Sequence, residues 1–173
     1  ALDVDVTVAG SYFNMSTGST MTGDRLDMLS QFIIPSDDYT VTNTRVLGLV
    51  TVQGDWDHKM PRLDIPSGTY RLLIGAHNVR LDGNYTQTHY TTDYGLYMVQ
   101  GSGVFDVVGD VTFGGAAHMT ASALSAGQMR VGGDFTVNCP GGNDCFVASG
   151  TSVEFYQRAN SPIAQTVNLV QSG

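Results

Sequence analysis

A short glycine corner recurs along this chain, and it constrains the fold more than any other feature. The clearest copy reads Val131-Gly132-Gly133-Asp134-Phe135-Thr136, where an apolar residue leads into a Gly-Asp turn. Earlier corners centre on four further glycines, namely Gly10, Gly54, Gly83 and Gly109. The intervals between the five corners are 44, 29, 26 and 24 residues. Repeats of about 20–50 residues are typical of solenoids, propellers and other arrays.

A second set of short apolar segments lies between the corners. The segments are residues 63–65, 70–74, 96–99, 124–127 and 146–150. Glycine at the corners supplies backbone conformations that other residues avoid. Each repeat therefore predicts two short strands, each followed by a corner. We expect an all-β, right-handed β-solenoid (β-helix) of short stacked coils with Gly-Asp corners, with about 4.8 Å between coils. A β-sandwich or jelly roll is the alternative, because it also combines short strands with frequent turns.

The chain length of 173 residues fits a single β domain over residues 1–173. Residues 2–8 alternate apolar and polar side chains, which is typical of a half-buried strand. Residues 16–45 lack the rhythm of the later repeats. We expect this segment to be an irregular insertion or a cover over the end of the core.

The charged residues are skewed toward two types. The acidic residues are 15 Asp and one Glu, and the basic residues are seven Arg and one Lys. Because Glu and Lys favour helices while Asp favours turns, this composition argues against helices. The net charge of -8 argues against a nucleic-acid partner, which would require a basic surface. No apolar run approaches the about 18 residues that indicate a membrane span.

Two cysteines, Cys139 and Cys145, flank a short loop that contains Pro-Gly-Gly. Two thiolates are too few for a structural zinc site, and the turn-rich loop suits a local disulfide. A disulfide predicts an oxidising, extracellular or cell-surface location. The small first residue, Ala1, is compatible with a secreted chain after signal-peptide cleavage.

The segment 124–165 resembles repeat regions of large secreted bacterial surface proteins of the adhesin-like type. The matching phrases are LSAGQMRVGGDFT, FVASGTSVEF and AQTV, and they cover about 40 of the 173 residues. The resemblance implies a β-helical, non-enzymatic surface module. It carries no catalytic residues over to this chain.

A polar residue follows each corner glycine. These residues are Ser11, Asp55, Asn84, Asp110 and Asp134. Stacked coils would place them in a ladder, where unscreened carboxylates about 5 Å apart repel. We expect each side chain to accept hydrogen bonds from the amides of its own turn. Calcium bridging Asp55, Asp110 and Asp134 is the weaker alternative, and no other cofactor is indicated.

Two aromatic stretches suggest polysaccharide binding as an alternative function. Asp55-Trp56-Asp57-His58 could form a sugar-binding or acid/base patch, although a decorated corner explains it more simply. Tyr85, Tyr90, Tyr94 and Tyr97 could form an aromatic row, but stacking between coils is the favoured interpretation. Asn14 and Asn84 begin glycosylation sequons.

No motif for an enzyme is present, and we expect no catalytic residues. A β-helical lyase needs clustered acids and bases, and basic residues are sparse here. The favoured hypothesis is a structural subunit of an extracellular fibre, filament or surface stalk, assembled from copies of itself by end-to-end β pairing. The expected assembly edges are Leu2, Val4, Val6, Val8, Val167 and Leu169. A carbohydrate-binding module of a secreted or cell-surface protein is the alternative.

Overall fold

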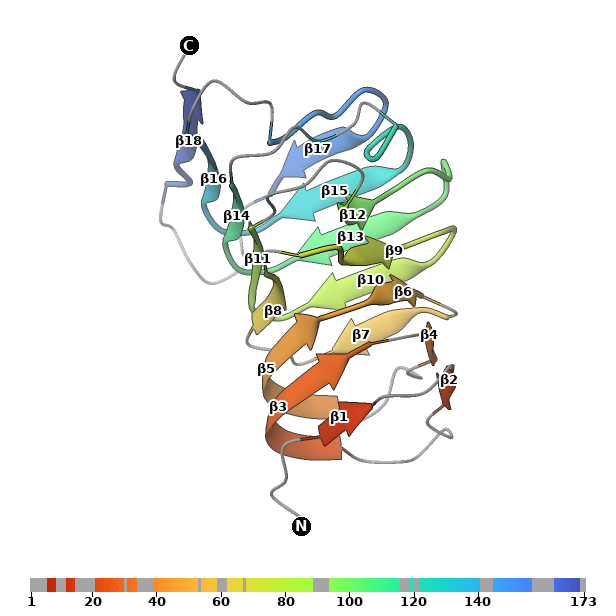
Figure 1. The fold of residues 1–173 in the computed structure, drawn as a ribbon. Helices are drawn as coiled ribbons and strands as arrows, with labels where there is room; N and C mark the ends of the chain where they lie inside the picture. Colours follow the sequence, from red (N-terminus) through yellow and green to blue (C-terminus); the bar gives the residue numbers. More distant parts are fainter. Residues whose placement is uncertain are drawn as a thin grey trace.

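A computed structural model shows that the chain is all-β. It describes residues 6–8, 12–14, 21–29, 31–33, 39–52, 54–58, 62–66, 68–88, 94–115, 119, 122–140, 145–156 and 164–171. Every strand pair within these ranges is parallel, so the sandwich alternative does not apply. Figure 1 shows the strands stacked along the molecule, with the two termini at opposite ends. The predicted β-solenoid is confirmed.

Four parallel sheets run along the stack. The long sheet contains β1 (Val6–Val8), β3 (Met21–Met28), β5 (Tyr39–Val46), β8 (Arg62–Ile65), β11 (Asn84–Thr88), β14 (Val111–Gly114), β16 (Phe135–Cys139) and β18 (Val167–Gln171). The five-stranded sheet contains β7 (Trp56–His58), β10 (Asn78–Leu81), β13 (Val104–Val107), β15 (Gln128–Val131) and β17 (Ser152–Phe155). The three-stranded sheet contains β6 (Leu49–Thr51), β9 (Arg71–Leu73) and β12 (Gly95–Tyr97), and the two-stranded sheet contains β2 (Tyr12–Asn14) and β4 (Gln31–Ile33).

Each regular turn has three sides rather than the two that the sequence predicted. The chain passes from the five-stranded sheet to the long sheet and then to the three-stranded sheet, as in β7-β8-β9 and β10-β11-β12. Bridges from Met98 to Leu124 and from Leu124 to Ala148 continue the third side. The prediction missed one side because the apolar residues before and after each glycine corner belong to different sheets.

The core is a set of apolar stacks between these sheets. Strand alternation places one side chain in two inside, and the parallel register puts each inward residue over its equivalent in the next turn. One stack runs from Trp56 through Val79, Phe105 and Met129. All four of these side chains are buried.

The segment 16–45 contains two of the longest strands, so the prediction of an irregular insertion is wrong for β3 and β5. These strands pair over seven residue positions and extend the long sheet. Leu26 and Met28 face the core, while Asp27 between them pairs with Arg45 on the next strand. The charged residues that made the repeat difficult to recognise in the sequence therefore lie on the outer face of regular strands, where they form ion pairs.

The disulfide between Cys139 and Cys145 is confirmed. Both half-cystines are completely buried at the end of β16. The amide of Cys145 also donates a hydrogen bond to the Cys139 sulfur, at 3.3 Å. The cross-link therefore forms part of the core of the last regular turns.

Candidate functional site

Three polar residues at the corner between the five-stranded and long sheets form a continuous ladder of hydrogen bonds. The Asn84 carboxamide Oδ1 accepts the backbone N–H of Asp110 at 2.8 Å, and the Asp110 Oδ1 accepts that of Asp134 at 2.9 Å. The Asp134 Oδ1 then accepts the N–H of Thr166 at 2.8 Å. We call Asn84, Asp110 and Asp134 the corner ladder. Its donors belong to the next turn, so the prediction that each side chain binds its own turn is wrong.

Asp55 makes the same kind of bond at a different corner. Its Oδ1 accepts the backbone N–H of Asn78 at 2.8 Å. Since Trp56 pairs with Val79, Gly54 and Asp55 precede the five-stranded sheet, whereas the later corner glycines follow it. The calcium candidates Asp55, Asp110 and Asp134 each accept a backbone N–H of the next turn. Among the described residues, no group of three or more His, Cys, Asp or Glu side chains could hold a metal ion.

The corner glycines stack directly on one another. The N–H of Gly109 donates to the carbonyl of Gly83, and the N–H of Gly133 donates to that of Gly109, both at 2.9 Å. A Cβ on Gly133 would collide with the Asp110 carboxylate and the Gly109 backbone. The positive φ angles lie instead at Gly68, Gly75, Gly95, Gly115 and Gly127. The expected positive φ at the corners is therefore wrong, and close backbone approach is what excludes a side chain.

Charges alternate in sign across the outer face of the five-stranded sheet. The register aligns Arg80, Asp106, Arg130 and Glu154 on successive strands, and we call this row the charge ladder. The Arg130 guanidinium lies 3.3 Å from the Asp106 carboxylate and 3.0 Å from that of Glu154. Residues of opposite charge lie opposite each other on neighbouring strands, so their interactions stabilise the sheet, whereas residues of like charge at these positions would repel.

A second charge cluster occupies the outer face of the long sheet. Asp27 accepts two hydrogen bonds from the Arg45 guanidinium at 2.8 Å and further bonds from Arg25. The Arg45 hydrogen bonds, with a further contribution from Arg25, lower the pKa of the nearly buried Asp27 carboxyl against the opposing effect of burial. The cluster therefore holds a carboxylate in its charged form without a metal.

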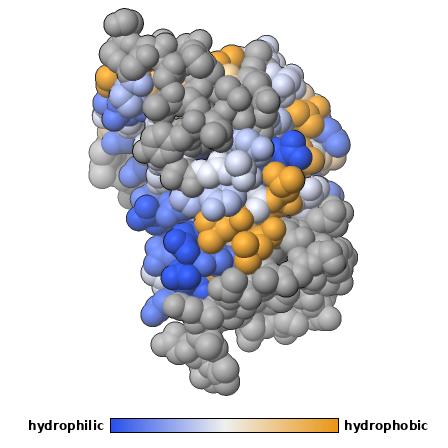
Figure 2. All heavy atoms as spheres, viewed as in Figure 1, coloured by the Kyte–Doolittle hydropathy of each residue, from blue (hydrophilic) through white to orange (hydrophobic). Residues whose placement is uncertain are grey.

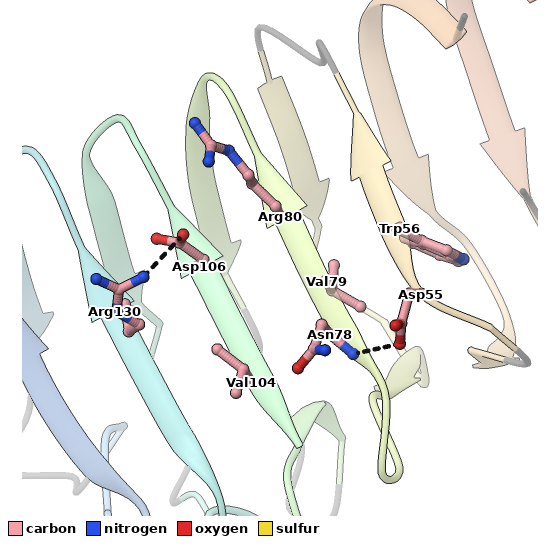
Figure 3. A pocket seen from close by; sticks show the side chains of 8 residues that line it. All are labelled: Asp55, Trp56, Asn78, Val79, Arg80, Val104, Asp106 and Arg130. Carbon is pink, nitrogen blue, oxygen red and sulfur yellow. Dashed lines mark hydrogen bonds and ion pairs between the residues drawn. The ribbon is translucent and has the colours of Figure 1, made fainter. Parts of the chain in front are cut away.

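A shallow groove of about 420 Å³ lies on the outer face of the five-stranded sheet (Figure 3). It is lined by Asp55, Trp56, Asn78, Val79, Arg80, Val104, Asp106 and Arg130. Figure 3 shows these residues on neighbouring strands, with the Arg130–Asp106 ion pair on one side and the Asn78–Asp55 hydrogen bond on the other. The groove is the candidate ligand site of the described surface.

Asp106 is the most unusual residue of the groove. Only 9% of this residue is exposed, and its Oδ1 has no hydrogen-bond partner among the described residues. Its Oδ2 accepts a 3.3 Å bond from Arg130. Burial, and next a hydrogen bond from the Tyr156 hydroxyl to the Asp106 carboxylate, raise the pKa of Tyr156 to about 12. The Asp106 carboxylate therefore takes bonds from Arg130 and Tyr156, while its Oδ1 is buried away from the surface of the groove.

The predicted patch from Asp55 to His58 does not form an exposed aromatic site. The Trp56 side chain is 1% exposed and packs in the core, so its ring cannot stack on a sugar. Asp57 and His58 lie on β7, but their side chains fall outside the described residues. Of the side chains of this patch that the structure describes, Asp55 lines the groove as a polar group.

The predicted stacking between coils is confirmed for Tyr85. Its buried ring makes edge contacts with Phe105 and Phe113 of the next turn, at centroid distances of 5.0 and 5.7 Å. The hydroxyl donates to Gln87 at 2.7 Å, and burial raises the pKa of Tyr85 well above its usual range. Tyr97 packs instead beneath the Arg71 guanidinium. Tyr90 lies outside the described residues.

The last turn leaves apolar residues uncovered. Val167 and Leu169 occupy inward positions of β18, where they pair with Phe135 and Val137 of β16. Their exposures are 51% and 65%, against 3% for each partner. Of the other predicted edge residues, Val6 and Val8 lie on β1, which pairs with β3, while Leu2 and Val4 lie outside the described residues.

The remaining predictions concern surface chemistry and neighbours. Asn84 of the second sequon is exposed, but its carboxamide belongs to the corner ladder. On the face drawn in Figure 2, hydrophobic and strongly hydrophilic residues lie side by side on the described surface. The described part of the chain contains no helix with the length and apolar character needed to cross a membrane.

Comparisons with protein-family models, curated proteins and solved structures find no match.

Proposed function

We propose that this chain is a structural β-solenoid unit of an extracellular or cell-surface fibre, extended by pairing between terminal turns of neighbouring copies. The observation that carries the proposal is the uncovered last turn. Its inward positions keep the apolar residues Val167 and Leu169, although no described strand lies over them.

Covering this turn would be favourable. Complete burial of a Val or Leu side chain contributes about 1.5–3 kcal/mol, so covering the exposed part of Leu169 contributes about 1–2 kcal/mol. The outer edge of β18 also presents backbone groups that are unpaired within the described strands, because β18 pairs only with β16. Both terms favour the addition of one more parallel turn.

The other end of the long sheet offers a complementary surface. Within the described strands, β1 pairs only with β3, so no described strand occupies its second edge. A parallel contact between β18 of one copy and β1 of the next would continue the long sheet. Because this contact joins two different surfaces and leaves a free end on each copy, it produces a filament rather than a closed dimer.

The proposed location follows from the cross-link and the surface. The buried disulfide between Cys139 and Cys145 is compatible with an oxidising compartment. Arg45 and Arg130 form ion pairs with acidic side chains on the outer faces of the strands. The resemblance of residues 124–165 to adhesin-like repeat regions supports the same, non-enzymatic interpretation.

The proposal is tested by sedimentation velocity and light scattering over a wide concentration range. We expect the chain to form elongated oligomers that electron microscopy shows as filaments. Leu169→Lys places a charge on the inward face of the last turn and should abolish assembly. Asn168→Lys adds the same charge to the outward face of the same strand and should leave assembly unchanged.

Deletion of residues 1–8, which removes β1, provides a second test at the opposite end. We expect this deletion to prevent elongation, since the acceptor edge for β18 would be lost. A monomeric chain at the highest concentration would contradict the proposal. So would oligomers that respond equally to the two lysine variants.

A further inference from the structure

We propose that the joint between neighbouring copies has a single register, in which the three residues of β1 of one copy pair with the first three residues of β18 of the copy before it. The pairs are Val6 with Val167, Thr7 with Asn168 and Val8 with Leu169. This inference rests on the proposed function, because it names the partner surface for the outer edge of β18. That surface is the edge of β1 that no described strand occupies, at the opposite end of the solenoid (Figure 1).

The register of the long sheet does not shift between its first strand and its last. Each strand pairs with the next so that one column of equivalent residues runs through all eight strands. One such column consists of Thr7, Asp27, Arg45, Asp64, Thr86, Thr112, Thr136 and Asn168. A further parallel turn in the same lattice therefore places Thr7 of the next copy beside Asn168.

The alternation of the strands excludes a shift of one residue. The inward positions of β18 are Val167 and Leu169. At the other end of the sheet, Val6 takes the register position of the completely buried Leu26, which is also an inward position. A shift of one residue would pair inward positions of one copy with outward positions of the other, and the two cores would then lie on opposite faces of the sheet.

The width of the apolar end excludes a shift of two residues. Such a shift keeps the faces, but it displaces the next copy sideways by about 6.6 Å, because each residue of a strand advances by about 3.3 Å. The apolar end extends beyond β18, since Phe155 on β17 is 40% exposed although Val131, its partner on β15, is completely buried. The unshifted register keeps the core of the next copy over Phe155 as well as over Leu169.

The same register determines the repeat and the direction of the filament. Each copy contributes eight strands to the long sheet, and neighbouring strands are about 4.8 Å apart, so we expect a rise of about 38 Å per copy. A two-fold contact between two β18 edges would be antiparallel and would leave neither edge for a further copy. It would therefore produce a closed pair at this end rather than a filament with one direction.

The test is oxidative cross-linking of paired cysteines introduced into the full chain. The chain has two native cysteines, which are bonded to each other, so the introduced thiols are the ones that react. In the proposed register, Thr7→Cys combined with Asn168→Cys places two Cα atoms about 4.8 Å apart, within the about 4.4–6.8 Å that a disulfide spans. We expect a ladder of covalent oligomers after mild oxidation, which a reductant converts back to monomers.

The matched control combines Thr7→Cys with Val170→Cys. Val170 is the next outward position of β18 and is 45% exposed. In the proposed register its Cα lies about 8 Å from that of Thr7, which is beyond the reach of a disulfide. We expect the ladder to be lost in this variant. Asn168→Cys alone should stay monomeric under oxidation, because its neighbours in the filament carry no thiol at the position of Thr7.

Electron microscopy of the unsubstituted chain separates this inference from the proposed function. If filaments form, the assembly stands, and the register is overturned by a ladder from the control pair, by the lack of a ladder from the Thr7 and Asn168 pair, or by a rise that differs clearly from about 38 Å. Covalent dimers of the Asn168→Cys variant indicate contact between two β18 edges and also overturn it. A chain that forms no oligomers overturns both the register and the proposed function.

Discussion

Replacement of Gly133 by alanine should destabilise the solenoid although the backbone angle at this position is ordinary. The added Cβ would collide with the Asp110 Oδ1 and with the Gly109 backbone of the preceding turn. Relief of the collision requires the turns to separate or the Asp110 side chain to rotate. Either movement breaks the hydrogen bond from the Asp134 amide to Asp110.

The structure sets the expected magnitude. Overpacking of a close contact costs about 1–3 kcal/mol. Loss of a hydrogen bond to a charged acceptor adds about 1.5–3 kcal/mol, with the lower end appropriate because this bond is exposed. We therefore expect Gly133→Ala to lower the free energy of unfolding by about 2.5–4.5 kcal/mol. For a domain of this size that corresponds to about 5–15 °C in Tm.

Urea and thermal unfolding followed by circular dichroism provide the measurement, and Gly54→Ala is the matched control. A Cβ on Gly54 meets no heavy atom within 4 Å. Its substitution should therefore change stability by less than about 0.5 kcal/mol. Equal effects of the two substitutions would show that close approach between turns is not what requires glycine at the corner.

Three further predictions address stability. Asp27→Asn should cost about 2–3 kcal/mol at neutral pH, because it removes a nearly buried ion pair, whereas Asp82→Asn, which removes an exposed pair, should cost less than about 0.5 kcal/mol. Because the folded pKa of Asp27 is lowered, the difference caused by Asp27→Asn should begin to shrink as the pH falls below about 4 and should disappear only below the lowered folded pKa. Reduction of the Cys139–Cys145 disulfide should cost about 2 kcal/mol in urea unfolding, and an unchanged midpoint would contradict this. Gln165→Met should cost about 1–3 kcal/mol in the same assay, because the Gln165 amide donates to three backbone carbonyls.

The repeat predicted the fold because a parallel solenoid requires equivalent residues at a nearly constant interval. Gly83, Gly109 and Gly133 do stack, as their spacing indicated. Gly54 was grouped with them on local resemblance, but it lies at another corner of the turn. A Gly-Asp pair alone cannot distinguish these corners, since both use a side-chain acceptor for the next amide.

The groove was missed because its residues carry no motif when they are considered singly. Arg80, Asp106 and Arg130 are separated by 26 and 24 residues, the same intervals that separate the corner glycines. Each of these residues lies three positions before a corner glycine, so the glycine repeat already contains the spacing of the charge ladder. The burial of Asp106 and its unpaired oxygen could not be predicted in this way, because they depend on how neighbouring side chains pack.

The last turn covers the corner of the turn before it but leaves its own apolar face open. In earlier turns the carbonyl of a corner glycine accepts the N–H of the next glycine, whereas the carbonyl of Gly133 accepts the side-chain amide of Gln165 at 3.1 Å. The Gly133 corner therefore finds its partners in Gln165 and Thr166 of the last turn. A terminal cap would also place polar residues at the inward positions, but β18 retains Val167 and Leu169 there. Burial of this apolar surface is thus a term that favours an added turn at this end.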